Sequence, residues 1–294
     1  MSLVSFVRVP SNSYKDLKES IEKSLQLINF SFKNDIRKIV IKPNMCYYYH
    51  PSTGEVTDPY FVGALIDVLR EKCGENSEIF VVESDASAMR CKYVFRFLGY
   101  DKLAEEKSFR LINLTEEKNR IIDAEVNDVK FKFYVPELFY DADLVINVPK
   151  PKYMDGVKIT CALKNMFGCN AFQKKFIYHR SLNEAIVAIN KLIRTDLVVL
   201  DGVIVHGKYT KRLNLVMSSS DPVAFDAAVA KIMGVNPMSV EQLVLASREG
   251  LGNLNFLPTG DFLYAKSEFP KKRLKDKARD TIAAIYLKIM QENK

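Results

Sequence analysis

The sequence predicts an α/β protein with a mixed, mainly parallel sheet that is flanked by helices and forms either one body or two α/β lobes. Short β-branched runs alternate with segments of helical spacing along the 294 residues, which is the pattern of such folds. The runs at 79–82 and 197–200 are apolar at every position, and the run at 144–148 is apolar except for Asn147, as expected for strands covered on both faces. A chain of this length can bury a full core without disulfide bonds.

The first half of the chain begins with a strand at 4–9, a helix at 14–28 and a strand at 38–42. A second helix starts at Asp58 and Pro59, because Asp caps a helix N-terminus and Pro fits its first position. After the strand at 79–82 come a helix at 90–98 and strands at 110–114, 129–135 and 144–148. The alternation of apolar and polar residues in 129–135 favours an antiparallel or edge position.

In the second half, a helix at 182–193 precedes the strand at 197–200. A strand at 213–217 then leads into another Asp-Pro helix start at Asp221. The remaining helices are predicted over 223–233, 239–248 and 274–289. We therefore expect an N-terminal α/β lobe at 1–150, a second α/β lobe at 151–265 that carries a lysine-rich segment, and a basic C-terminal helix at 266–294. The last helix either docks on the body or binds a protein partner or a membrane surface.

Positive charge is concentrated in two parts of the chain. The formal net charge is +7, but residues 266–294 hold nine basic and four acidic residues, and residues 150–180 hold seven basic residues and one acidic residue. The rest of the chain is therefore net acidic. A basic island in an acidic body favours a local anion site over a nucleic-acid surface, so nucleic acid is not an expected partner.

Several common classes of site and location lack support in the sequence. No stretch reaches about 18 consecutive apolar residues, and residues 1–10 do not resemble a signal peptide, so we expect no membrane insertion and a cytoplasmic location. Five cysteines without a C-x-x-C pair predict no disulfide framework, zinc ribbon or iron–sulfur cluster. Residues 202–208 match the start of a P-loop, but Tyr209 stands where the magnesium-binding hydroxyl belongs.

Polar residues follow the predicted strands. Ligands bind beyond the carboxyl ends of parallel strands, so these residues are candidates for one shared site. They are Lys42, Asn44, Glu83, Asp85, Asn147, Lys150, Asp201 and Asp221. The carboxylates of Glu83, Asp85 and Asp221 are the candidate ligands for a divalent metal ion, since hard cations take oxygen ligands. The alternative is that these residues are ordinary helix caps.

Residues 150–168 form the centre of the predicted site. Thr160 is expected to cap a short helix over 161–167 that ends at Gly168, and the free amide groups at its start would favour an anion. Lys164 lies one turn after Thr160 on the same face. Clustered cations lower the pKa of a lysine, which suits a base or a nucleophile. The alternative is a solvated basic surface.

We expect separate sets of residues for catalysis and for substrate binding. The catalytic candidates are Lys164, Asp201 and His179, with His179 as an acid–base group or a metal ligand. The substrate-binding candidates are the cationic, amide and hydroxyl side chains around the same loop, namely Lys42, Asn44, Asn147, Lys150, Lys158, Thr160 and Asn165.

These motifs resemble, in the same order, those of an uncharacterised family, the domain of unknown function 362. The resemblance covers residues 36–252 and rests on Lys42-Pro43-Asn44, Thr57-Asp58-Pro59, the runs at 141–150 and 160–168, His179, Asp201-Gly202 and the run at 220–226. It implies no established activity. Tyr153 and Met154 follow Lys152 where the family often has Lys-x-His, and the family's ferredoxin-like cysteine module is missing, so a bound iron–sulfur cluster is not implied. A looser analogy is to the amino-terminal domain of lactate racemases.

Two classes of function fit this reading. The first is an enzyme acting on a small anionic substrate that bears a phosphate or carboxylate, with a divalent metal as the cofactor to be considered. The second is a non-catalytic ligand-binding or accessory protein of a redox or cofactor-assembly system, whose protein partner would bind the basic C-terminal helix. The sequence leaves the choice between them open, together with the substrate, the reaction and the oligomeric state.

Overall fold

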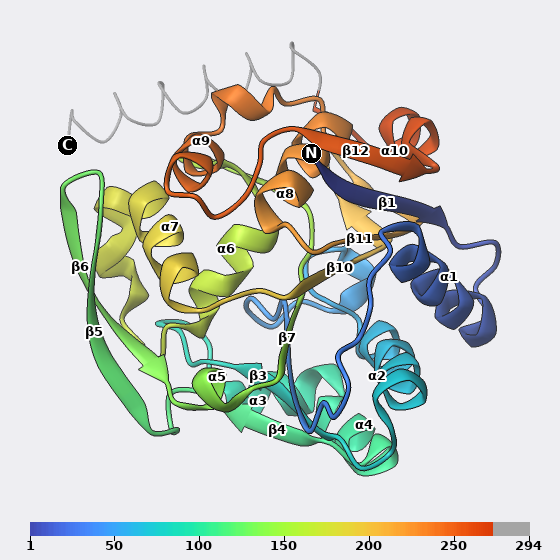
Figure 1. The fold of residues 1–294 in the computed structure, drawn as a ribbon, viewed down its shortest axis with the longest axis horizontal. Helices are drawn as coiled ribbons and strands as arrows, with labels where there is room; N and C mark the ends of the chain where they lie inside the picture. The colour runs from blue at the N-terminus through green and yellow to red at the C-terminus, as the bar shows by residue number, and fades with distance from the viewer. Residues whose placement is uncertain (273–294) are drawn as a thin grey trace, which may run out of the picture.

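A computed structural model describes residues 1–272, which form one eight-stranded sheet covered by helices on both faces (Figure 1). The strands are β1 (Ser2–Arg8), β2 (Lys38–Pro43), β3 (Glu78–Glu83), β4 (Arg110–Asn113), β7 (Leu144–Val148), β10 (Leu197–His206), β11 (Thr210–Ser219) and β12 (Phe256–Gly260). Their order is β12-β1-β11-β10-β7-β2-β3-β4. Of these eight strands, β11 alone runs against the others. The predicted mixed, mainly parallel sheet is therefore confirmed.

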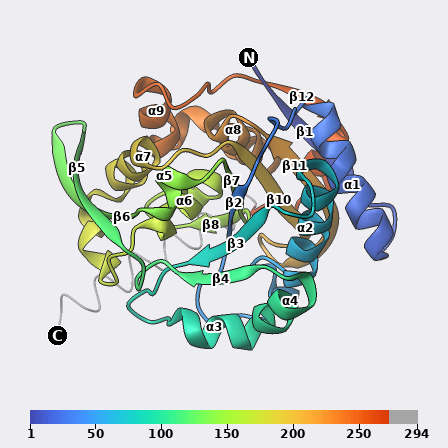
Figure 2. The same cartoon turned by 60° about the horizontal axis from the view of Figure 1, so that its bottom comes forward.

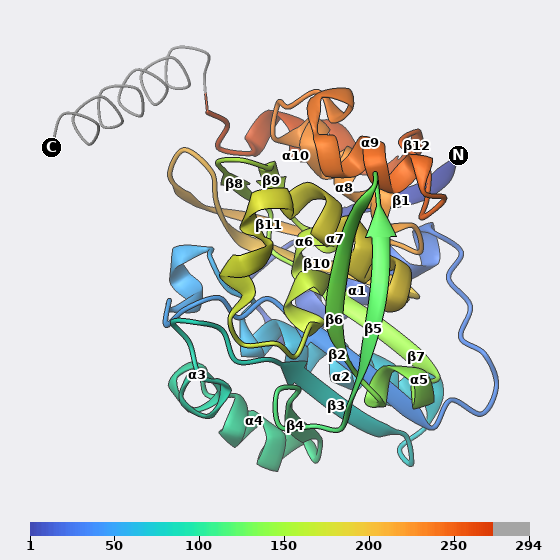
Figure 3. The same cartoon turned by 90° about the vertical axis from the view of Figure 1, so that its left-hand side faces the viewer.

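Ten helices and two small hairpins complete the part of the chain that the structure describes. The helices are α1 (Tyr14–Leu27), α2 (Pro59–Cys73), α3 (Cys91–Leu98), α4 (Tyr100–Lys107), α5 (Leu138–Asp141), α6 (Ala162–Met166), α7 (Leu182–Leu192), α8 (Pro222–Ile232), α9 (Glu241–Arg248) and α10 (Phe262–Glu268), with 3-10 turns η1 (Pro51–Thr53), η2 (Phe167–Cys169), η3 (Lys175–Ser181) and η4 (Pro237–Ser239). One hairpin is β5 (Asn119–Val126) with β6 (Val129–Pro136), and the other is β8 (Lys152–Met154) with β9 (Lys158–Thr160). Figure 3 shows β5 and β6 running beside α7.

The sheet separates two apolar cores (Figure 2). Helices α1 to α4 pack on one face, where Ile39 and Ile41 of β2 point. Helices α6 to α10 pack on the other face, where Val40 of the same strand points. Alternate residues of one strand thus reach opposite layers, which matters below for the charged residues at the strand ends.

The chain changes direction across the sheet between β2 and β7. From β2 it proceeds to β3 and β4 on one side, whereas β7 leads to β10 on the other. In open α/β sheets the crevice at such a switch point is where ligands bind. Lys42 and Asn147 are register partners in these two strands, so both lie at this crevice.

The expected division into a lobe at 1–150 and a lobe at 151–265 does not match the sheet. Strand β1 lies between β11 and β12, so the first residues of the chain pair with strands from its last third. Sequence patterns identify each strand but not the strands that pair with it. The pairing of the strands determines how the chain divides into lobes. Of the predicted C-terminal helix at 266–294, residues 273–294 lie outside the described part.

Candidate functional site

A cavity of about 480 Å³ lies at the carboxyl ends of β2 and β3. Its walls come from the segments that follow these strands, from β8, and from α6 and η3. This volume is in the range of small-molecule sites. Its charged side chains are those of Lys42, Lys152, Lys164, Lys175, Glu55 and Glu83, with His179 in addition. The lysines therefore exceed the carboxylates by two.

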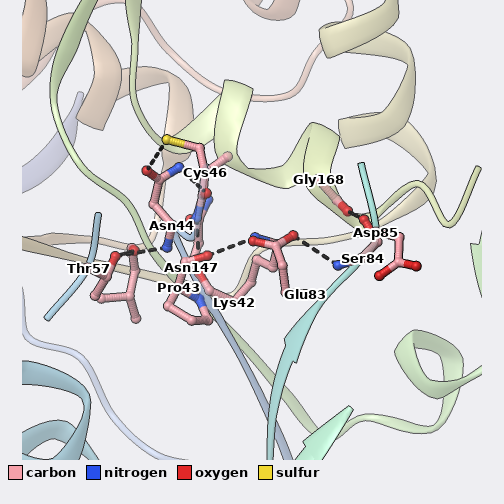
Figure 4. Close-up of polar contacts among 12 residues, drawn as sticks. Lys42, Pro43, Asn44, Cys46, Thr57, Glu83, Ser84, Asp85, Asn147 and Gly168 are labelled. Carbon is pink, nitrogen blue, oxygen red and sulfur yellow. Dashed lines mark hydrogen bonds and ion pairs between the residues drawn. The ribbon is translucent and has the colours of Figure 1, made fainter. Parts of the chain in front are cut away.

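Lys42 and Glu83 form a buried ion pair across the ends of β2 and β3, with 2.7 Å between Nζ and Oε2. The Lys42 ammonium also donates to the Pro43 carbonyl oxygen at 2.7 Å, and the Ser84 amide donates to Glu83 Oε1 at 3.0 Å. Figure 4 shows the pair together with the bond from Ser84 to the Gly168 carbonyl oxygen. The positive charge of Lys42, which was predicted to bind substrate, is thus neutralised by the carboxylate of Glu83, which was predicted to bind a metal ion.

Three asparagines tie α6 to the sheet. Asn44 Nδ2 donates to Asn165 Oδ1 at 2.9 Å, and Asn165 Nδ2 donates to Asn147 Oδ1 at 2.8 Å and to the Lys42 carbonyl oxygen at 3.0 Å. Asn147 Nδ2 in turn donates to the Ala162 carbonyl oxygen at 2.8 Å. All three were predicted to bind substrate. The structure brings them together, and Asn44 and Asn165 line the cavity, whereas Asn147 is fully buried beneath it.

Lys164 and Lys175 carry the unmatched charge of the cavity. Within residues 1–272, the Lys164 ammonium makes no hydrogen bond or ion pair, and it lies 4.9 Å from the centre of the Phe167 ring. Lys175 donates to Ser84 Oγ at 2.8 Å and to the Asp85 carbonyl oxygen at 2.6 Å, but no carboxylate in the described chain pairs with it. Burial, with the neighbouring charge of Lys152, lowers the pKa of Lys164 to about 8, and burial lowers the pKa of Lys175 to about 8.

Lys152 and Cys46 face each other on the cavity wall, and neither was assigned a role from the sequence. Lys152 Nζ lies 2.9 Å from Cys46 Sγ and donates to Asn44 Oδ1 and to the Glu55 carbonyl oxygen, both at 3.0 Å. The Glu55 carboxylate is 3.7 Å from the same ammonium. Residues 44–50 form a loop between β2 and η1 with no periodic pattern, so no sequence signal places Cys46 beside the lysines.

The N-terminus of α6 does not offer the free anion site that the sequence predicted. The buried Asp226 carboxylate of α8 accepts from the Ala162 amide at 2.7 Å and from the Leu163 amide at 3.0 Å. The Asp226 carboxylate therefore occupies the position expected for a bound anion. Thr160 belongs to β9 and caps nothing, although it lines the cavity. Burial raises the pKa of Asp226 to about 7.

The mouth of the cavity is aromatic. Tyr47, Tyr49 and Phe176 line it and remain 54%, 47% and 58% exposed. His179 is exposed in η3 at the same rim, where it can reach the solvent and a ligand in the cavity. Large exposed rings around a pocket can shield the apolar part of a ligand from water.

Lys150 and Asp201 form a second buried pair, but on the opposite face of the sheet. Their charged atoms are 3.2 Å apart, and Asp201 also accepts from the Asp58 amide at 3.0 Å, next to α2. Residues two apart in a strand point to the same face, so Asp201 lies on the same face of β10 as Val199. That face is the one covered by α1 and α2. The two residues therefore do not line the cavity, and the predicted catalytic role of Asp201 and the binding role of Lys150 lose their geometric basis.

Lys158 and Asp221 are also outside the cavity. The Lys158 ammonium donates to the Ser239 carbonyl oxygen on the surface. Asp221 caps α8 at the amino ends of the parallel strands, opposite to the end where the cavity lies. This is because β11 runs antiparallel and ends beside the start of β10. The prediction that Asp221 shares the site requires β11 to run parallel to its neighbours, and it is wrong because β11 is antiparallel.

The candidate metal ligands do not assemble. Glu83 pairs with Lys42, Asp85 pairs with Arg90 at 2.9 Å and accepts from the Cys91 amide, and Asp221 is remote. In residues 1–272 no group of three or more His, Cys, Asp or Glu side chains is arranged to hold a metal ion.

A sequence model described as "Domain of unknown function (DUF362)" matches residues 39–231. The thylakoid-associated protein sll1697 of Synechocystis sp. is 24% identical over 265 residues, covering 84% of this chain and 79% of that protein. The lactate racemase apoprotein of Thermoanaerobacterium thermosaccharolyticum aligns in structure with a TM-score of 0.43 and 14% identity, over 76% of this chain and 55% of the racemase. Separately, none of the helices in the described part has the length and apolarity to cross a bilayer.

Proposed function

We propose, from the premise that this chain belongs to the DUF362 family of domains of unknown function, that its cavity binds a small carboxylate- or phosphate-bearing molecule and that the protein is an enzyme acting on it. The ligand would place its acidic group against Lys164 and Lys175. The aromatic rim of Tyr47, Tyr49 and Phe176 would cover the rest of it. Asn44 and Asn165 would fix its orientation from the floor of the cavity.

The single observation behind this proposal is the surplus of two ammonium groups in the cavity. Burial penalises a charged lysine, and a second cation nearby adds repulsion, as the lowered pKa values of Lys164 and Lys175 indicate. The two lysines that are buried more deeply than these, Lys42 and Lys150, each have a carboxylate partner. A bound anion would supply that partner for Lys164 and Lys175 through charge-assisted hydrogen bonds.

The proposed catalytic group is Lys164, which would transfer a proton to or from the ligand. A lysine whose pKa is about 8 can both give and take a proton near neutral pH, which suits general acid–base catalysis. His179, at the rim, is the proposed second proton-transfer group. The proposed steps are those that these side chains can perform themselves. A ligand-binding protein without turnover would share the same cavity, and product formation separates the two.

The test of anion binding is a calorimetric titration with sulfate, which mimics a phosphate or carboxylate. We expect Lys164→Met and Lys175→Met each to weaken the affinity by about tenfold or more, the value of one charge-assisted hydrogen bond. Lys158→Met is the matched control, since that surface lysine points away from the cavity. Unchanged affinity in both cavity variants, with the fold retained, would contradict the proposal.

The affinity for sulfate is also expected to depend on pH. Lys164 and Lys175 bind an anion only as ammonium ions, and both have a pKa of about 8, so affinity should fall as the pH rises through that value. Sulfate itself keeps its charge over this range. A titration series from pH about 6.5 to about 9.5 should show the fall, and Lys164→Met should make it shallower because one of the two titrating groups is gone. A flat series in the unmodified protein would count against these two lysines as the anion ligands.

A further inference from the structure

We propose that Cys46 is the nucleophile of this cavity, and that its substrate is a carbonyl compound which also carries a carboxylate or phosphate. This inference rests on the proposed anion-binding function, because the positive charge of Lys164 and Lys175 would attract the acidic group, which Lys175 then holds while Lys164 faces the carbonyl oxygen. It adds a reacting atom and a chemical class of substrate to that function.

The position of Cys46 is the first observation. The residue lies just after β2, lines the cavity and is partly exposed, and its sulfur is 2.9 Å from the Lys152 ammonium. The other groups near the sulfur are the Asn44 side-chain oxygen at 3.8 Å and the Glu55 carbonyl oxygen at 3.7 Å. The thiolate is the nucleophilic form of cysteine, and a facing ammonium stabilises it.

The four other cysteines lack this setting. Cys91, Cys161 and Cys169 are buried, and burial raises the pKa of each of these thiols. Cys73 is partly exposed like Cys46, but it ends α2 away from the cavity, and burial raises its pKa to about 11. Cys73 is therefore an internal reference for a partly exposed thiol that has no facing ammonium, and the Lys152 variants below test the ammonium itself.

Lys164 is the second and independent observation. Its ammonium faces the cavity without a hydrogen-bonding partner in residues 1–272, so the position is open to a ligand atom. It is close enough to Cys46 and Lys152 for both to shift its pKa. A substrate carbonyl placed between the sulfur and this ammonium would meet a nucleophile on one side and a proton donor on the other.

The proposed step is an addition that needs no oxidant or reductant. The lone pair of the Cys46 thiolate forms a bond from sulfur to the carbonyl carbon, and the π electrons of the C=O bond move to its oxygen. That oxygen takes a proton from the Lys164 ammonium, which becomes a neutral amine. The product is a tetrahedral thiol adduct, held through its acidic group by Lys175.

The test compares two alkylating probes, neutral iodoacetamide and anionic iodoacetate, in the folded full-length protein at pH about 7. With either reagent the sulfur–carbon bond forms and iodide leaves. Peptide mass spectrometry measures the rates at Cys46 and Cys73 in the same sample. We expect Cys46 to react about tenfold or more faster than Cys73 with iodoacetamide, and its advantage to grow about tenfold further with iodoacetate.

Variants separate the two contributions. Lys152→Met should lower the rate at Cys46 with both probes, whereas Lys152→Arg should keep most of it because the charge remains. Lys164→Met and Lys175→Met should reduce the added preference for iodoacetate, and Lys158→Met should change nothing. Thermal melting of each variant checks that the fold is intact.

Two outcomes would count against different claims. If Cys46 reacts no faster than Cys73 with iodoacetamide, the assignment of Cys46 as the nucleophile is wrong, whatever the result of the sulfate titration. If Cys46 is fast but shows no added preference for iodoacetate, Cys46 stands as a reactive thiol, but the anion-binding function and the acidic substrate class fail.

Discussion

Glu83→Gln is expected to lower the free energy of unfolding by about 3–5 kcal/mol, because it leaves the ammonium of Lys42 buried without its counter-charge. Both side chains are almost fully buried, at 1% and 6% exposure, and their charged atoms are 2.7 Å apart. Equilibrium denaturation with urea, followed by circular dichroism, measures the change. Replacing both residues with apolar ones, Lys42→Met with Glu83→Leu, should recover much of the loss because no lone charge remains.

The matched control for this prediction is an exposed ion pair on α1. Lys15 and Glu19 are 3.8 Å apart with side chains 82% and 59% exposed. Glu19→Gln should change the free energy of unfolding by less than about 0.5 kcal/mol, since water screens such pairs. If Glu83→Gln lowered the free energy of unfolding as little as Glu19→Gln does, the buried pair would contribute little to stability.

Asp226→Ala is expected to cost about 3–5 kcal/mol, because it leaves two buried amide groups at the start of α6 without an acceptor. Those amides belong to Ala162 and Leu163, and α6 carries Lys164. The variant should therefore also weaken sulfate binding, as a positioning effect. Urea denaturation and sulfate titration of the same sample measure both. Ser13→Ala, which removes a single exposed cap of α1, should cost only about 1 kcal/mol.

The same carboxyl group should make stability depend on pH. Burial raises the pKa of Asp226 from 3.8 to about 7, so the folded state holds its proton more tightly than the unfolded state does. The stabilisation from this group is complete below its unfolded pKa and is lost as the pH rises through about 7. Asp226→Asn has no such titration, and the difference in unfolding free energy between the two proteins should change across this range. A difference independent of pH would contradict the raised pKa.

The fold class and most elements could be predicted because local chemistry specifies them. The Asp58-Pro59 and Asp221-Pro222 pairs start α2 and α8 as expected, and the run at 144–148, apolar except for Asn147, is β7. Part of the site could be predicted for the same reason. Lys42, Asn44 and Asn165 follow or face buried strand ends, and parallel strands bring such ends together.

The rest of the site depends on facts that a sequence does not show. Asp201 was placed with Lys42, but β10 continues past it, and the alternation of the strand turns its side chain to the other face. Asp221 was misplaced because the direction of β11 cannot be read from its residues. Lys175 reaches the cavity from the start of the 3-10 turn η3 and Cys46 from the loop after β2, and neither segment has a helical or strand periodicity that gives the side chain a direction.

The pairing of β1 has a consequence for how the protein is made. Residues 2–8 have their sheet neighbours in 210–219 and 256–260, so this strand cannot add to the sheet until more than 200 further residues have been synthesised. Contacts that distant in sequence slow folding and leave strand edges open to other chains in the meantime. Shortening the chain from its C-terminus to before residue 256 would remove the parallel neighbour of β1 and expose its edge, so fragments of this kind should aggregate during expression.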